Sequence, residues 1–118
     1  MNSTILGSKV TGEVITPSFD FKNQLRLGLV NGSGVTFTET IATASVSAAV
    51  YCGTDATPSN VISGPATISG TVVTQKIIGG LVGVVYDLTI TITTTVQSPY
   101  KPQTIIRHAF VTIIPTET

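Results

Sequence analysis

Hydrophobic residues along this chain recur at every second position over short stretches, which is the period of a β-strand. The stretch "SFDFKNQLRL" places Phe19, Phe21 and Leu25 at odd positions, with polar residues between the two phenylalanines. The stretch "VYDLTITITTT" has the longest alternation, and we expect its apolar side chains to point inward and its threonines to point to water. In this and two further stretches, the predicted inward rows are Tyr86, Leu88, Ile90 and Ile92, then Val46, Ala48 and Val50, then Ile105, Ala109, Val111 and Ile113.

Turn residues divide the chain into short elements. The best-defined predicted strands lie at about 44–51, 71–78 and 105–114, beside the alternating stretch above, and the Gly-rich cluster at 29–35 predicts a turn. Two further pieces are predicted on either side of Gly64-Pro65. About seven short strands separated by turns, with no alternation of strands and helices, predict an all-β, immunoglobulin-like antiparallel β-sandwich. We expect one domain over residues 14–118, with residues 1–13 as an extended N-terminal arm outside the core.

The polar residues of this chain carry mainly hydroxyl groups rather than charges. Charged residues make up 10% of the chain, against about 25% in an average soluble domain, and six basic residues balance six acidic ones. The chain contains 21 Thr and 10 Ser. This balance provides no basic field for nucleic acid or for an anionic membrane. The mean hydropathy of +0.43 favours apolar surface reserved for neighbouring proteins.

The glycine cluster in "KIIGGLVGVVYDL" has two possible roles. A phosphate-binding loop needs a helix after the glycines, but Gly83 is followed by a predicted strand, which argues against a nucleotide site. An immunoglobulin-like sandwich instead has a tyrosine at this place, whose hydroxyl bonds back to the backbone of the preceding corner. Tyr86 and the inward Leu88 fit that tyrosine corner, with Gly79, Gly80 and Gly83 turning the chain. The alternative is an ordinary core tyrosine after a generic loop.

Candidate chemistry is sparse. Cys52 and His108 are the single cysteine and the single histidine, and a nucleophile–base pair would require the fold to bring them together. We expect Cys52 to be a small buried apolar residue and His108 to lie on an outward strand position. Asp55 can supply one ligand to a calcium loop but not a whole site. We therefore predict no catalytic residue, no metal site and no cofactor. No apolar run reaches the ~20 residues of a membrane-spanning helix, and the N-terminus does not have the pattern of a secretory signal.

The turn and strand motifs together resemble a family of small immunoglobulin-like virion proteins of tailed bacteriophages, often described as fibre–tail adaptors. The shared pattern is a "FDF" strand, then "G-x-D…PS-x-x-x-SG", then "I-x-G-x-x-V-x-Q", then "GG-x-x-G-x-x-Y-x-L-x-x-x-x-T". These motifs lie at residues 19–21, 53–64, 68–75 and 79–93, and the resemblance covers roughly residues 18–113. The hairpin at 96–104 is longer here than in relatives, which often have a short Gly turn.

The resemblance implies a structural role in a virion, with no catalytic residue. The expected function is a tail or neck adaptor that connects the tail to fibres, present as a symmetric homo-oligomer and contacting tail, neck, fibre or capsid proteins. Alternatives are a capsid cement or decoration protein, or a module that binds a host surface or carbohydrate. Candidate interface residues are Ile5, Leu6, Tyr100 and Lys101, in the N-terminal arm and the 96–104 hairpin.

Overall fold

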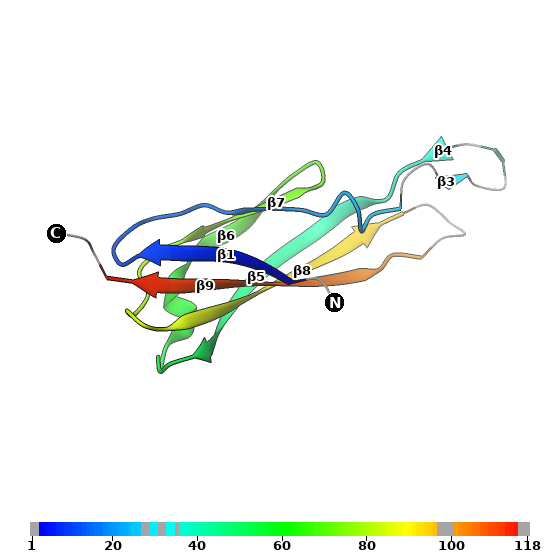
Figure 1. The fold of residues 1–118 in the computed structure, drawn as a ribbon. Coiled ribbons are helices and arrows are strands. Elements are labelled where there is room, and N and C mark those ends of the chain that lie inside the picture. Colours follow the sequence, from blue (N-terminus) through cyan, green and yellow to red (C-terminus); the bar gives the residue numbers. More distant parts are fainter. Residues whose placement is uncertain (1–2, 27–28, 31–32, 35, 97–100, 116–118) are drawn as a thin grey trace.

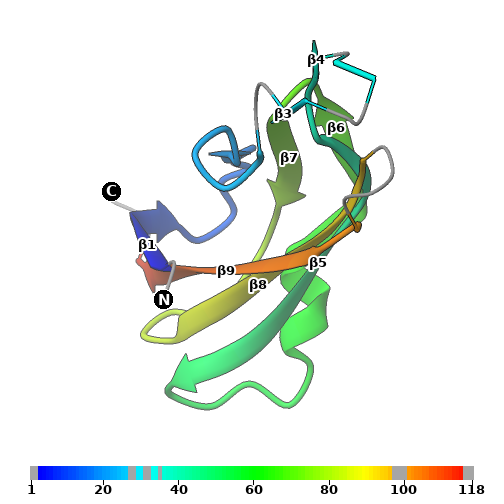
Figure 2. The same ribbon diagram turned by 90° about the vertical axis from the view of Figure 1, so that its right-hand side faces the viewer.

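The computed structural model describes residues 3–26, 29–30, 33–34, 36–96 and 101–115. These residues form two layers of β-strands (Figure 1; Figure 2). The elements are, in chain order, β1 (Ser3–Val10), β2 (Ser18–Asp20), β3 (Leu29–Val30), β4 (Thr36–Phe37), β5 (Thr40–Cys52), the 3-10 helix η1 (Pro58–Val61), β6 (Ile62–Ser69), β7 (Val72–Ile77), β8 (Val85–Thr95) and β9 (Thr104–Ile114).

The strand order is that of an immunoglobulin-like sandwich. One sheet has the order β1-β9-β8-β5 and the other has the order β2-β7-β6, so seven described strands make up the two layers. The chain crosses between the layers from β1 to β2, from β5 to β6 and from β7 to β8, as in Greek-key sandwiches. The predicted all-β sandwich is thus confirmed. One pairing differs from the antiparallel prediction, because β1 runs parallel to β9.

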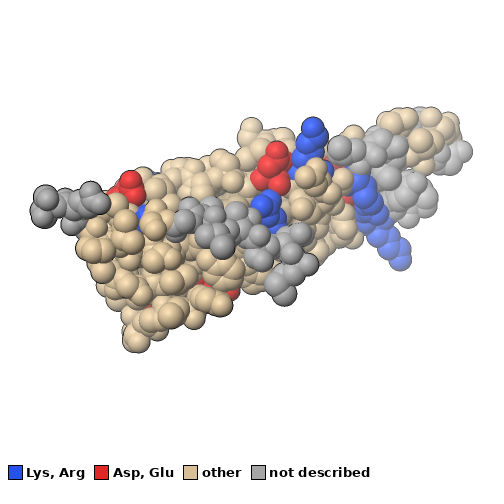
Figure 3. Space-filling view, in the orientation of Figure 1, with Lys and Arg blue, Asp and Glu red and all other residues tan. Residues whose placement is uncertain are grey.

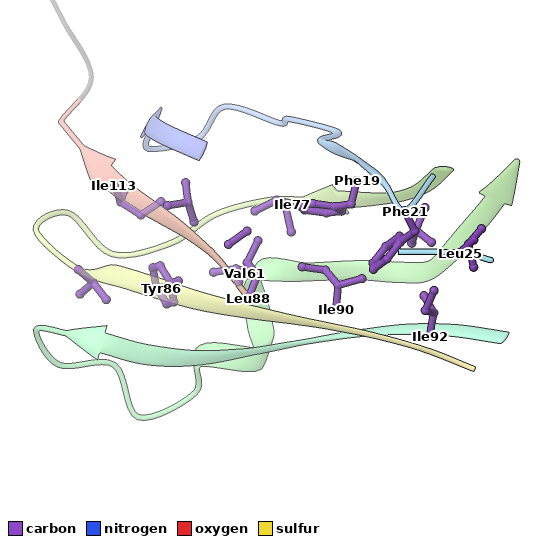
Figure 4. Close-up of a cluster of buried hydrophobic side chains, with 14 residues drawn as sticks. Phe19, Phe21, Leu25, Val61, Ile77, Tyr86, Leu88, Ile90, Ile92 and Ile113 are labelled. Atoms are coloured by element: carbon purple, nitrogen blue, oxygen red, sulfur yellow. The ribbon is translucent and has the colours of Figure 1, made fainter. Parts of the chain in front are cut away.

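The core lies between the layers and is built from the predicted inward rows (Figure 4). Tyr86, Leu88, Ile90 and Ile92 of β8 are fully buried. They meet apolar side chains from both sheets, which are Phe19, Phe21, Leu25, Val61, Val73, Ile77, Val84, Ala109, Val111 and Ile113. The side chain of Arg107 closes one margin of this core, with its guanidinium carbon 5.3 Å from the ring centre of Phe21. The period-2 pattern therefore predicted the packed faces of β8 and β9 correctly.

The N-terminal segment is extended as predicted, but it is not an arm outside the core. Residues 3–10 form β1, which pairs with β9 from Ser3 opposite His108 to Val10 opposite Ile114. Thr11 continues this pairing, with its N–H donating to the carbonyl of Ile114 at 3.0 Å. The reason is that β9 leaves a row of backbone groups on its outer side, and an unpaired row of this kind favours a further strand.

The sandwich is elongated, with extents of 62 × 23 × 22 Å. The short hairpin of β3 and β4 extends from one end, beyond the sheets, and agrees with the turn predicted at 29–35 (Figure 1). The turn between β7 and β8 lies at the opposite end, near the ends of β1, β5 and β9. The two ends, the outer faces and the edge strands of the sheets are thus the parts of the domain that neighbours can reach.

Candidate functional site: the sheet face and the two loop ends

The corner between β7 and β8 contains the predicted hydroxyl-to-backbone bond. The N–H of Leu81 donates to the hydroxyl of Tyr86 at 2.9 Å. The same hydroxyl donates to Oδ2 of Asp55 at 2.6 Å, which joins the loop after β5 to the corner. Burial and the bond to Asp55 raise the pKa of Tyr86, while the bond from Tyr86 lowers the pKa of Asp55. The tyrosine therefore holds two loops at one end of the sandwich.

The glycines of this corner adopt the conformation that the turn requires. Gly79, Gly80 and Gly83 have φ values of +58°, +99° and +85°, in a region that L-residues rarely adopt. The turn is also fixed from β1, because the buried ammonium of Lys9 donates to the carbonyl of Gly79 at 2.8 Å. Burial lowers the pKa of Lys9, opposed by the nearby Glu13. The first strand and the glycine turn are thereby held together.

We expect Tyr86→Phe to lower the free energy of unfolding by about 1–2 kcal/mol, since two partly buried hydrogen bonds of the hydroxyl are lost. The N–H of Leu81 and the carboxylate of Asp55 each lose a hydrogen-bond partner, whereas the aromatic ring stays in the core. Urea denaturation measures the change. Tyr51→Phe is the matched control, because Tyr51 is 68% exposed and its hydroxyl contributes nothing to the corner. Equal midpoints for Tyr86→Phe and the parent protein would remove the hydroxyl from the explanation of the corner.

At the opposite end, a buried carboxylate joins four segments of the chain. Glu39, directly before β5, is fully buried and pairs with the guanidinium of Arg26 at 2.8 Å. It also accepts bonds from the hydroxyl of Thr94 at 2.6 Å and the amide of Gln103 at 2.7 Å. Burial alone raises the pKa of Glu39, but these bonds together outweigh it and lower the pKa to about 2. The carboxylate is thus ionised, and it fixes the base of the 96–104 hairpin.

The outer face of the four-stranded sheet is rich in hydroxyl groups and nearly free of charge. Its rows across β5, β8 and β9 are Thr43, Thr93 and Thr104, then Ser45, Thr91 and Ile106, then Ser47, Thr89 and His108, then Ala49, Asp87 and Phe110. The one acidic residue on these rows is Asp87, whose Oδ1 lies 2.9 Å from Nδ1 of His108. In the view of Figure 3, most of the described surface is likewise uncharged, and Lys, Arg, Asp and Glu occupy a few small areas.

One end of this face carries aromatic side chains. Tyr51 at the end of β5 meets Phe110 of β9 edge-on, with their ring centres 4.9 Å apart. Tyr100, the aromatic residue among the predicted interface residues, lies outside the described residues. The prediction that Cys52 is buried is wrong, because its side chain is exposed. The pairing shifts by one residue between Val50 and Cys52, so Cys52 faces Val85 on the outer side of the sheet.

The structure keeps the candidate nucleophile and base apart. Cys52 lies opposite Val85, and His108 lies opposite Thr89. These positions are separated by about 13 Å along β8 at the rise of a β-strand, with a further separation across the sheet. His108 lies on the outer face, as predicted, and its imidazole is bonded to Asp87. Asp55 accepts the hydrogen bond from the hydroxyl of Tyr86 in the tyrosine corner.

Three of the four predicted interface residues are described, and they lie in two places. Ile5 and Leu6 lie in β1, where the pairing with β9 is irregular between Ile5 and Gly7. Lys101 is exposed at the base of the 96–104 hairpin, and its carbonyl accepts a bond from Arg26 at 2.6 Å. The sequence pattern did not identify Tyr51, Phe110, Asp87 or Glu39 as functional residues. Tyr51 and Phe110 could have been singled out because aromatic residues are rare in this chain.

Within the described residues, no three His, Cys, Asp or Glu side chains lie close enough together to hold a metal ion. The described part of the chain also contains no helix with the length and apolar character needed to cross a membrane. Comparison of the chain with protein-family models, curated proteins and solved structures found no match.

Proposed function

We propose that this protein is a non-catalytic structural subunit of a tailed-bacteriophage virion, located in the tail or neck, where it connects the tail to fibres. The observation that carries an assembly role is the outer face of the four-stranded sheet, whose rows are mainly hydroxyl side chains, with a few apolar residues and one carboxylate–imidazole pair. Protein interfaces are depleted in charged residues at their centre, because burying a charge costs more free energy than burying a neutral group. The assignment to a phage, and to its tail, is supported by the resemblance of the turn and strand motifs alone.

The two ends of the sandwich support the same proposal. Each end is held by a buried polar network, around Tyr86 at one end and around Glu39 at the other. Such networks fix loops in one conformation, which a subunit repeated in a symmetric particle requires. In this proposal the partners are tail, neck, fibre or capsid proteins and further copies of the chain, and the protein needs no cofactor.

Deletion of the gene tests the proposal. We expect DNA-filled heads that lack fibres and fail to adsorb to the host, and electron microscopy with an adsorption assay would record both. Particles that retain fibres but become fragile or lose DNA would contradict the tail position and favour a capsid cement protein. Normal, infectious particles would contradict both structural roles.

The aromatic pair favours a second candidate, a module that binds a host surface or carbohydrate. Tyr51 is 68% exposed beside Phe110, and Asp87 and His108 supply hydrogen-bonding groups next to the rings. Exposed aromatic rings beside polar groups are suited to stacking on sugar rings. Complementing the deletion with a Tyr51→Ala gene separates the two functions: a structural subunit restores fibres and adsorption, whereas a binding module restores intact particles that fail to adsorb.

A further inference from the structure

Three of the four edges of the two sheets carry features that oppose pairing with another chain. Natural sheets protect their edges with inward-pointing charges, prolines, irregular pairing or very short strands. The edge strand β1 has the buried inward Lys9 and an irregularity between Ile5 and Gly7. The edge strand β2 is three residues long. These statements concern the residues that the structure describes.

The edge strand β6 is protected in a different way. It contains Gly64 and Pro65, and its pairing with β7 is irregular between Ser63 and Thr67. The side-chain amide of Gln75 donates to the carbonyls of Ser63 and Gly64, at 3.1 and 3.2 Å. An edge that bends and lacks the N–H of a proline is a poor template for a further strand.

The fourth edge, β5, has none of these features over most of its length. It is 13 residues long and contains no charged residue, no proline and no glycine. Its pairing with β8 is regular from Thr43 to Val50, and the shifts in register lie only near its two ends. Among the described strands, β8 alone is hydrogen-bonded to β5. The far side of β5 therefore has a row of backbone donors and acceptors that no described strand pairs with, although β6 and η1 of the other layer pack next to β5. Such an edge favours pairing with another strand.

Burial beneath β5 supports the same conclusion. The inward side chains of β8 are fully buried, whereas the inward row of β5 is only partly buried. That row consists of Ala44, Val46, Ala48 and Val50. A further strand beside β5 would extend the layer over these apolar side chains and remove more of their surface from water.

We infer that β5 pairs with β5 of a second copy of this chain, antiparallel and about a two-fold axis, to form one continuous eight-stranded sheet. Antiparallel self-pairing places inward residues opposite inward residues and outward residues opposite outward ones. The outward residues Thr43, Ser45, Ser47 and Ala49 are small and uncharged, so no like charges meet across the axis in any such register. A two-fold contact of this kind uses the β5 edge of both copies and leaves none for a third copy. Lys9 in β1, at the opposite edge of the sheet, opposes further growth there. This inference deepens the proposed assembly function and rests on it for its biological setting.

Sedimentation velocity of the purified full-length protein over a range of concentrations tests the inference. We expect a concentration-dependent dimer that is weakened about ten-fold or more by the double variant Ser45→Lys and Ser47→Lys, because lysines then face each other in each register centred on Ser45, Val46 or Ser47. Thr67→Lys with Ser69→Lys is the matched control: it adds the same charge at exposed positions of β6 and should leave the dimer unchanged. Mixing the lysine variant with Ser45→Glu and Ser47→Glu should restore the dimer, which also shows that both variants are folded.

Three results would overturn the inference: a wild-type monomer at every concentration, equal weakening by the β6 control, or failure of the lysine and glutamate variants to associate. A wild-type monomer whose β5 amides exchange slowly only in the particle would assign this edge to another protein. The outcome is independent of the gene deletion. Fibreless particles together with a monomeric purified protein would overturn this inference alone, and a β5-paired dimer that is missing from particles would overturn the proposed function alone.

Discussion

Gly80→Ala should lower the free energy of unfolding by about 3 kcal/mol, because it combines backbone strain with overpacking. Gly80 has φ +99°, and a Cβ atom at this position would lie 2.7 Å from Cγ1 and 2.8 Å from Cδ1 of Ile113. Ile113 is buried between the sheets and is held in β9 by the pairing on both of its sides. Either the side chain of Ile113 or the glycine turn must therefore shift, at the place where Tyr86 and Lys9 hold the corner. Urea denaturation monitored by circular dichroism measures the loss.

Gly83→Ala is the matched control for this prediction. Gly83 has φ +85°, but no atom lies within 4 Å of the position that its Cβ would take. The substitution should cost about 1 kcal/mol, the strain of the left-handed backbone alone. If the two variants are equally stable, the contact with Ile113 does not contribute and the turn depends only on φ.

The faces of the central strands could be predicted because their pattern is local and regular. A strand buried on one side needs an apolar residue at every second position, and β8 satisfies this from Tyr86 to Ile92. Cys52 was expected to be buried because cysteine usually is, but its side chain is exposed. A single extra residue after Val50 turns the following side chain to the other face, and a one-residue shift leaves no mark in the hydrophobic pattern.

Glycine and proline were informative but not sufficient. Gly64-Pro65 predicted a break between two strands, whereas the structure has one strand, β6, with irregular pairing at this place. The amide of Gln75 makes this possible, because it donates to the carbonyls that the ladder leaves without a partner. That compensation comes from a side chain more than ten residues away and could not be anticipated from the turn residues alone.

The contacts that sequence reasoning missed join segments far apart in the chain. The corner tyrosine was predicted, but its bond to Asp55 spans 31 residues. The pairing of β1 with β9 joins the two ends of the chain. Glu39 was not recognised, because Arg26, Thr94 and Gln103 reach it from three separate segments. A single acidic residue among threonines and alanines was the available signal, and it is compatible with an exposed position as well.

Glu39→Ala should destabilise the protein by about 3 kcal/mol, the lower end of the range for breaking a buried charge pair from one side, because the side chain of Arg26 is 35% exposed. The substitution leaves the guanidinium of Arg26 without its carboxylate and removes the acceptor of two further side chains, those of Thr94 and Gln103. Denaturant unfolding at pH 7 measures the loss. Glu13→Ala is the control, because Glu13 is an exposed glutamate and its removal should change stability by less than about 1 kcal/mol.

The ionisation of Glu39 should also appear in the dependence of stability on pH. Its pKa is lowered from 4.5 to about 2 in the folded protein, so its contribution is complete above about pH 4.5 and is lost as the pH falls to about 2. The difference corresponds to about 3 kcal/mol. Other carboxylates titrate in the same window, so the comparison is with Glu39→Gln, which keeps the shape of the side chain and cannot ionise. The variant should be less stable than the parent protein at pH 7, and the gap between the two should narrow by about this amount between pH 4.5 and pH 2. A gap that stays constant over this range would show that the carboxylate charge does not hold this end of the sandwich together.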